Sequence, residues 1–235
     1  MASRIDSHTI SHAENIFSGD AYAAGANDSG RGIPRVGVVV ADFGTPVILD
    51  ADGICASQAV AGAGALTIDG ALAAAGAANL DVARTLQVVS ANAGDTTQIL
   101  TVTGTDMYGA PVVEEITLNG TSPVFGGKAF KTVTSVVASA ATADNVTVGT
   151  SDALGLPYAI ADAGDAFLAN EAGANATIGP IVGADTTSPA TATTGEVRGT
   201  FNPTVVLDGS TSVKLYYFPA GRKTVTAYGV PQYSA

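Results

Sequence analysis

The chain has 235 residues, and its 21 acidic and 10 basic side chains give a formal net charge of −11. Nucleic-acid binding as a main role is excluded, because the basic residues are few and unclustered while duplex DNA requires several phosphate contacts from basic side chains. Cys55 is the single cysteine, so no intramolecular disulfide can form and the fold depends on packing and on hydrogen bonds between strands.

The composition favours sheets over helices. Glycine accounts for 28 residues, and much of the apolar share consists of Ala and Val, which is typical of thin sheets with many turns. No signal peptide is expected, because residues 1–17 lack an apolar core. The Ala- and Gly-rich run 56–80 is too often interrupted by polar residues to span a membrane, so we expect no membrane partner.

Residues 1–32 are polar and rich in turn-forming residues, and they predict an extended N-terminal arm. The alternative is a disordered tail without a role. Both histidines of the chain, His8 and His12, belong to this segment. A helix would place them together, but no third metal ligand accompanies them, and a base on an arm cannot hold the geometry that catalysis needs. We therefore expect neither a metal site nor a catalytic base here.

The first strands are predicted after residue 33. Val36, Val38 and Val40 share one face of an extended segment, which is typical of a strand. A second short strand is predicted at 45–50, before an Asp-Gly turn. Residues 57–81 are rich in Ala, yet their glycines and their lack of a bulky apolar face favour strand and loop over helix.

Alternation of apolar and polar side chains is clearest in the middle of the chain. Leu86 and Val88 point one way while Thr85 and Gln87 point the other, which predicts a sheet with one solvent-exposed face. Gly109 is predicted to take a positive φ in a hairpin turn. The same alternation predicts further strands at 98–105, 112–118, 128–139 and 145–150.

The return strand of the predicted hairpin carries two adjacent carboxylates, Glu114 and Glu115. Neighbouring residues on a strand point to opposite faces, so these two cannot work together as an acid/base pair. One of them could be buried against a basic partner, Lys128 or Lys131.

Known catalytic motifs are missing from the sequence. Cys55 has no base near it in the sequence and is expected to be a small buried hydrophobe. The chain contains neither a G-x-S-x-G nucleophile elbow nor a G-x-x-x-x-G-K-[ST] phosphate loop. We therefore expect that the protein is not an enzyme and that it binds no cofactor.

Residues 161–235 continue the pattern of short strands, with candidates at 164–170 and 176–182. The segment "GADTTSPATATTG" at 183–195 has low complexity and predicts a surface loop or linker. A strand apolar on both faces is predicted at 212–218, with Val213, Leu215 and Tyr217 on one face and Lys214, Tyr216 and Phe218 on the other. Such a strand is either central in its sheet or part of a subunit contact.

Many short strands between Gly, Asn, Asp and Pro turns, without strong helices, predict an all-β fold. We expect an antiparallel, jelly-roll-like β-sandwich with long loops and an extended N-terminal arm. The expected divisions are the arm at 1–32, a main β-sandwich domain at 33–160 and a second β-rich part at 161–235. This last part belongs either to the same sandwich or to a small subdomain.

Several phrases between residues 80 and 202 resemble virion structural proteins of tailed bacteriophages. They are "LDVAR" at 80–84, "VTGTDMYG" at 102–109, "KAFKTVTSV" at 128–136, "GTSDALGLP" at 149–157 and "ATATTGEVRGTF" at 190–201. The first phrase departs from the family, which has "PR" where this chain has "AR". The resemblance covers about half of the chain.

Such phage proteins are similar to capsid decoration (cement) proteins, which lie on the outer surface of the virion head. The resemblance implies that the chain is made in the bacterial host cytoplasm and binds the outside of the capsid, with the major capsid protein as its partner. It also implies a homo-oligomer, a trimer at local threefold positions, that stabilises the shell by binding only its assembled state.

We expect the arm at 1–32 and the region from Tyr216 to Phe218 to supply the contacts with the capsid. The candidate contact residues are the large apolar side chains of these segments: Ile5, Ile10, Ile16, Phe17, Tyr216 and Phe218. Two other roles stay open, a structural protein of the phage tail or baseplate and a bacterial surface-binding β module. The second would need a concave aromatic platform, and the sequence contains no Trp to build one.

Overall fold

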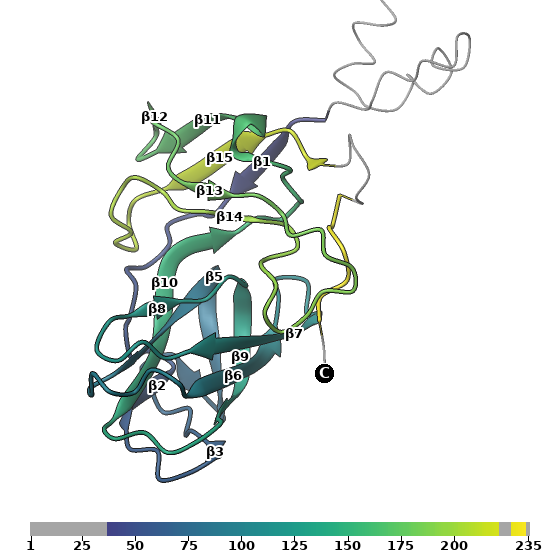
Figure 1. The fold of residues 1–235 in the computed structure, drawn as a ribbon. Helices are drawn as coiled ribbons and strands as arrows, with labels where there is room; N and C mark the ends of the chain where they lie inside the picture. The colour runs from purple at the N-terminus through teal and green to yellow at the C-terminus, as the bar shows by residue number, and fades with distance from the viewer. Residues whose placement is uncertain (1–36, 221–226, 234–235) are drawn as a thin grey trace, which may run out of the picture.

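The computed structural model describes residues 37–220 and 227–233. Within them every regular element is a β-strand, except for one 3-10 helix, η2 (Ala163–Asp165). The strands are antiparallel and form two curled sheets in a sandwich-like arrangement, with long loops between many of them (Figure 1). The predicted all-β fold is therefore confirmed. The predicted arm at 1–32 lies outside the described residues.

The smaller sheet has four strands in the order β1-β15-β11-β12 and lies at the top of Figure 1. Its strands come from distant parts of the chain: β1 (Val39–Asp42), β11 (Ala166–Glu171), β12 (Ala174–Ala176) and β15 (Val213–Tyr217). The strand predicted at 212–218 corresponds to β15, and it lies between β1 and β11. A central position, one of its two expected explanations, is confirmed.

The larger sheet has 11 strands, and its main path runs in the order β13-β14-β10-β5-β9-β6-β7. Short strands extend it, because β2 pairs with β10, β3 with β9, and both β4 and β8 with β5. Its strands are β2 (Cys55–Gln58), β3 (Gly64–Ala65), β4 (Ala73–Ala74), β5 (Ala77–Ser90), β6 (Ile99–Thr105), β7 (Pro111–Thr117), β8 (Val124–Phe125), β9 (Phe130–Ala138), β10 (Val146–Gly155), β13 (Ile181–Val182) and β14 (Thr200–Phe201). In both sheets, strands from before residue 160 pair with strands from after it: β1 pairs with β15 in the smaller sheet, and β10 pairs with β14 in the larger sheet.

Two long strands, β5 and β10, form the centre of the larger sheet. The register of this pair shifts between Thr150 and Leu154, and β10 curves upward toward the smaller sheet (Figure 1). Gly149 is needed where the 50–53 turn crosses β10, because a Cβ on it would lie 2.0 Å from the carbonyl oxygen of Asp50. A small residue in the strand therefore allows the two segments of backbone to approach closely.

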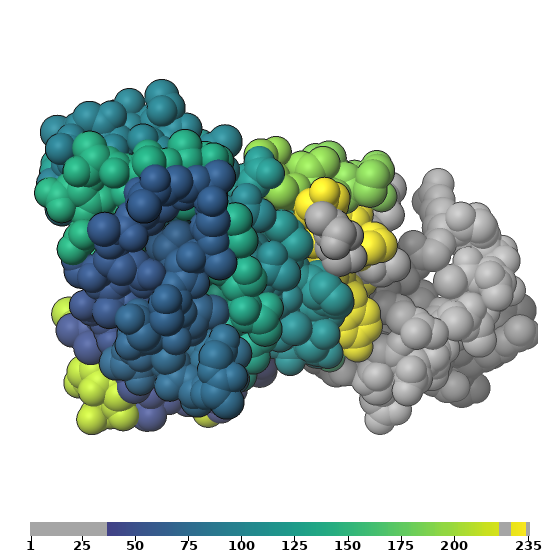
Figure 2. Space-filling view, turned by 90° about the horizontal axis from the view of Figure 1, so that it is seen from below, coloured from purple at the N-terminus to yellow at the C-terminus, as the bar shows by residue number. Residues whose placement is uncertain are grey.

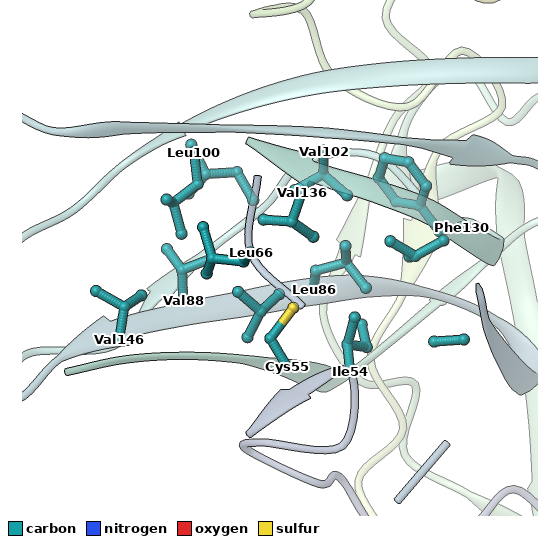
Figure 3. Packing of buried hydrophobic residues seen from close by; sticks show 14 of the residues in the cluster. Ile54, Cys55, Leu66, Leu86, Val88, Leu100, Val102, Phe130, Val136 and Val146 are labelled. Carbon is teal, nitrogen blue, oxygen red and sulfur yellow. The ribbon is translucent and has the colours of Figure 1, made fainter. Parts of the chain in front are cut away.

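Each sheet contributes to its own hydrophobic core. The larger core fills the concave side of the curled sheet with branched aliphatic side chains and one ring, including Ile54, Leu86, Val88, Leu100, Val102, Phe130, Val136 and Val146 (Figure 3). The smaller core joins the smaller sheet to the ends of β10 and β14 through Leu154, Leu156, Phe201, Val213, Leu215 and Tyr217. Both cores are built from residues far apart in sequence, so each holds distant segments together.

The predicted hairpin forms as β6 and β7, with Leu100 opposite Ile116. Gly109 has a φ of 79°, which confirms its predicted place in the turn. The carboxylate of Asp106 accepts hydrogen bonds from the backbone N–H groups of Tyr108 (2.8 Å) and Ala110 (2.9 Å). The turn is therefore held by its own acidic residue as well as by the glycine.

The strand predicted at 45–50 is wrong. This segment belongs to no strand: the carbonyl of Asp50 accepts from the N–H of Thr150 in β10 (2.8 Å), but side chains bond several of its other backbone groups. The N–H of Val47 donates to Asp81 (2.8 Å), its carbonyl accepts from Arg84 (3.0 Å), and the N–H of Asp50 donates to Thr150 (2.9 Å).

The expectation of a solvent-exposed face on β5 is also wrong. Thr85 and Gln87 do point away from the larger core, yet both are buried. Segments around Gly126 and Thr200 lie over this side of the strand. Because these segments are distant in sequence, the local alternation of β5 could not reveal them.

Candidate functional site

The described residues contain neither a cluster of metal ligands nor a reactive thiol. No three His, Cys, Asp or Glu side chains in this part of the chain gather where they could hold a metal ion. Cys55 is buried as predicted, and burial raises the pKa of its thiol to about 12. The thiolate that would act as a nucleophile is therefore scarce near neutral pH. His8 and His12 lie outside the described residues.

The segments that the structure describes, 37–220 and 227–233, include no helix of the length and apolar character that a membrane crossing requires.

Glu114, rather than Glu115, is the buried carboxylate of β7. Its Oε1 accepts hydrogen bonds from the backbone N–H groups of Gly127 and Lys128. Burial raises the pKa of Glu114 to about 7, although these bonds and the Lys128 ammonium oppose the shift. Lys131, the other expected partner, instead donates to two backbone carbonyls. Neither Oε2 of Glu114 nor Nζ of Lys128 has a hydrogen-bond partner among the described residues.

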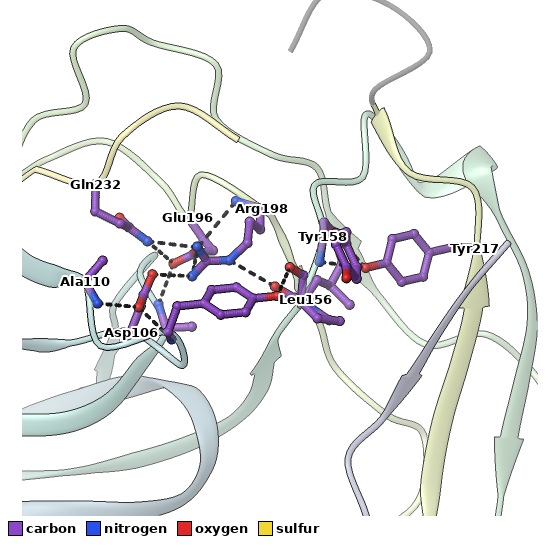
Figure 4. Close-up of polar contacts among 11 residues, drawn as sticks. Asp106, Ala110, Leu156, Tyr158, Glu196, Arg198, Tyr217 and Gln232 are labelled. Atoms are coloured by element: carbon purple, nitrogen blue, oxygen red, sulfur yellow. Dashed lines mark hydrogen bonds and ion pairs between the residues drawn. The ribbon is translucent and has the colours of Figure 1, made fainter. Parts of the chain in front are cut away.

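Arg198 is the centre of a second buried group of charges (Figure 4). Its Nη2 lies 2.9 Å from Asp106 Oδ2 and 3.2 Å from Glu196 Oε1. Its Nε donates to the carbonyl of Leu156 (3.2 Å), and the amide of Gln232 donates to Glu196 (3.1 Å). Burial raises the pKa of Glu196, and the Arg198 guanidinium opposes that shift. Nη2 of Arg198 and Oε1 of Gln232 lack a hydrogen-bond partner among the described residues. Because the ion pairs nevertheless join four distant segments, we assign these groups a structural role.

Tyr217 connects the smaller sheet to this group of charges. Its hydroxyl donates to the carbonyl of Tyr158 (2.7 Å) and accepts from the N–H of the same residue (3.1 Å). The ring of Tyr228 lies 5.3 Å from that of Tyr158 and 5.6 Å from that of Tyr108, and Tyr108 lies 5.2 Å from the Arg198 guanidinium. A continuous series of contacts therefore runs from β15 to the ion pairs.

The last described segment, residues 227–233, covers the edge of β7. It lies beside the low-complexity loop, and the two are drawn yellow and light green in Figure 2. The N–H of Val113 donates to the carbonyl of Tyr233 (3.0 Å), and the N–H of Glu115 donates to the carbonyl of Ala192 (2.9 Å). These bonds occupy β7 donors that would otherwise be open to pairing with another chain.

One face of the smaller sheet is open to solvent over the described residues, and we call it the outer face. It is the side that carries Val40, Tyr216 and Leu168, because Val40 pairs with Tyr216 and Tyr216 pairs with Leu168. The next row of residues points the other way and is buried in the smaller core: Ala41, Leu215 and Ala169. The sheet thus has one buried side and one side without a core of its own.

Apolar side chains gather at one end of the outer face. Val38, Val40 and Phe167 expose 49%, 48% and 47% of their surface. The ring of Phe167 lies 6.4 Å from that of Tyr216 and 5.0 Å from that of Phe218. Contiguous exposed apolar patches on a folded domain mark interaction sites far more often than isolated exposed residues do. This end of the outer face is therefore the candidate protein-binding surface.

The other end of the outer face is polar, which bounds the apolar patch. Lys214 Nζ lies 2.8 Å from Asp42 Oδ2, and Asn170 pairs with Lys214 on the adjacent strand. The hydrogen bond between the side chains of Lys214 and Asp42 lowers the pKa of Asp42 and raises the pKa of Lys214. A partner that covers the apolar end would meet an ion pair at the margin of the contact.

The structure brings only part of the predicted contact set together. Tyr216 and Phe218 lie on the outer face, whereas the other four predicted residues lie outside the described residues: Ile5, Ile10, Ile16 and Phe17. Sequence reasoning missed Phe167 and did not connect Val38 and Val40 with Tyr216. The alternating valines were a visible signal, but their meaning depends on the pairing of β1 with β15.

No protein-family model, curated protein or solved structure matches the chain. The role of the outer face therefore rests on the chemistry of its own residues.

Proposed function

We propose that the chain is a capsid decoration protein of a tailed bacteriophage, which binds the outside of the head shell through the outer face of its smaller sheet. The apolar end of that face is the observation that carries this proposal, because nearly half of the surface of Val38, Val40 and Phe167 is exposed there. The resemblance of residues 80–202 to virion proteins supports the phage assignment.

The chemistry of the outer face suits a protein partner. Full burial of an aliphatic or aromatic side chain contributes about 1.5–3 kcal/mol, so covering three half-exposed ones contributes a few kcal/mol. Tyr216 and Phe218 add aromatic area beside Phe167, and tyrosine is among the residues that dominate binding energy at protein interfaces. The partner in this proposal is the major capsid protein.

Binding to the assembled shell alone would stabilise it by mass action, without any chemical step. The proposal includes a homotrimer, since copies at local threefold positions can share equivalent contacts with the lattice. It also gives residues 1–32 a role as a second contact. Deletion of residues 2–30 should then weaken binding to heads without unfolding the two sheets.

The role of the outer face in binding heads can be tested with matched substitutions of aromatic residues. Purified heads that lack the protein would be mixed with wild type, with the double variant F167S/Y216S, or with F125S, which removes an exposed ring elsewhere. Co-sedimentation should show binding that is at least about tenfold weaker for the double variant and unchanged for F125S. Equal binding by all three proteins would remove the outer face from the proposal.

Copy number separates the head from the tail or baseplate alternative. A decoration protein should be present in hundreds of copies per particle, whereas an axial tail component follows sixfold symmetry and is far scarcer. Quantitative band intensities from purified virions measure this ratio directly. A count near that of the tail proteins would favour the alternative.

A further inference from the structure

A cleft of about 410 Å³ lies away from the outer face, beside the larger sheet. Its floor comes from β5 and β10, through Thr85 and the segment 151–153. One wall is formed by the segment 125–127, and the other by residues of and around β13 and β14. The volume is within the range of about 300–1,000 Å³ that is usual for small-molecule sites. The cleft uses none of the residues of the outer face, so it is a separate feature.

Three polar side chains line this cleft without a hydrogen bond to another described residue: Asp152, Thr200 and Asn202. Oδ1 of Asp152 is buried without a hydrogen-bond partner, as is Nε of Arg84, with which Asp152 interacts electrostatically. Buried and half-buried polar groups in folded proteins are nearly always paired. A carboxylate, a hydroxyl and an amide around one cavity thus keep hydrogen-bonding capacity that a polar ligand could use.

The remaining lining fits a ligand with both polar and apolar faces. Thr85 and Ser151 share a hydrogen bond on the floor, so their hydroxyls retain further capacity for a ligand. At the rim, 59% of the surface of Phe125 is exposed. Beside it, Gly127 presents bare backbone to the cleft, facing Gly195 of the opposite wall. An aromatic face next to several hydrogen-bonding side chains is complementary to a sugar ring, whose C–H groups and hydroxyls lie on different sides.

The charges favour a neutral ligand. Among the described residues, Asp152 is the only charged side chain that lines the cleft. The whole chain carries a net charge of −11, so an anion would be repelled. Arg84 lies within electrostatic range of Asp152 but is itself fully buried and donates to Val47 and Asp81. We propose that the cleft is a binding site for a neutral saccharide, with Asp152 and Asn202 bonding its hydroxyls and Phe125 stacking against its ring.

The test uses the full chain and a glycan array of neutral and acidic oligosaccharides, followed by calorimetric titration with the neutral glycans that bind. Wild type should bind at least one neutral glycan, and it should bind no acidic glycan more tightly than that neutral one. Asn202→Ala and Phe125→Ala should each weaken that binding about tenfold, because each removes one of the principal contacts. Asn175→Ala and Phe167→Ala change the same residue types on the smaller sheet and should bind as wild type does.

Unfolding is controlled by comparing the circular dichroism spectra and thermal midpoints of all four variants with those of wild type. A chain that binds no neutral glycan on the array would overturn the proposal. So would glycan binding that persists in the double variant F125A/N202A, or that is lost equally in the control variants. None of these outcomes depends on the binding of capsids, so the saccharide site and the decoration role can fail independently.

Discussion

Replacement of Glu114 by Gln should remove a pH dependence from the stability of the protein. The carboxylate is buried in β7, and its pKa is raised from the ordinary 4.5 to about 7. A folded state that holds this proton more tightly than the unfolded state is favoured at low pH. The stabilisation is complete below about pH 4.5, falls as the pH rises, and is lost above about pH 7.

The size of the effect follows from the same two values. The interval between 4.5 and about 7, at about 1.4 kcal/mol for each pH unit, corresponds to about 3–4 kcal/mol. The Gln side chain keeps an oxygen that can accept from the N–H groups of Gly127 and Lys128. Its amide NH₂ replaces Oε2, which has no partner, so the substitution removes the titration and preserves the bonds.

Urea unfolding of wild type and E114Q at pH 5, 6, 7 and 8 measures this difference. The two proteins should be similar at pH 5, and E114Q should gain up to about 3 kcal/mol relative to wild type by pH 8. Glu115→Gln, on the exposed face of the same strand, should follow wild type throughout. A constant separation between wild type and E114Q from pH 5 to pH 8 would refute the reasoning.

Three further predictions concern the interior. Arg198→Ala should lower the free energy of unfolding in urea by about 3–5 kcal/mol, because it leaves two buried carboxylates without their cation. A loss below about 1 kcal/mol would contradict the structural role of Arg198. Gly149→Ala should lower the free energy of unfolding by about 1–3 kcal/mol, because its Cβ would overlap the Asp50 carbonyl. Gly62→Ala, with open space around it, should lower it by less than about 1 kcal/mol. Similar unfolding midpoints for the two variants would be evidence against the contact. Cys55 should react with a thiol reagent only after denaturant is added, and rapid labelling of the native chain would show that the buried site is wrong.

The local elements were predictable where one short segment contains all the information. The β6–β7 hairpin follows from alternating residues on either side of a turn, and Gly109 supplies the backbone conformation which that turn requires. The segment 45–50 has similar apolar residues but forms no strand. Its backbone is bonded instead by the side chains of Asp81 and Arg84, which the segment itself does not encode.

The candidate surface was predictable only in part. Alternation within β15 separates Tyr216 and Phe218 from the buried side of the strand, as the sequence indicated. Adding Val40 and Phe167 to them requires the pairing of β15 with β1 and β11, across about 170 and 50 residues of sequence respectively. The polar side chains of the cleft depend on similar long-range packing, and no local pattern marks Asn202 as a binding residue.

The central claim is that the outer face of the smaller sheet binds the head shell. Electron cryomicroscopy of virions that carry this chain tests it most directly. We expect β-rich density in hundreds of copies on the outside of the head, with Phe167 and Tyr216 facing the major capsid protein. Density confined to the tail, or head density in which this face points into solvent, would contradict the account.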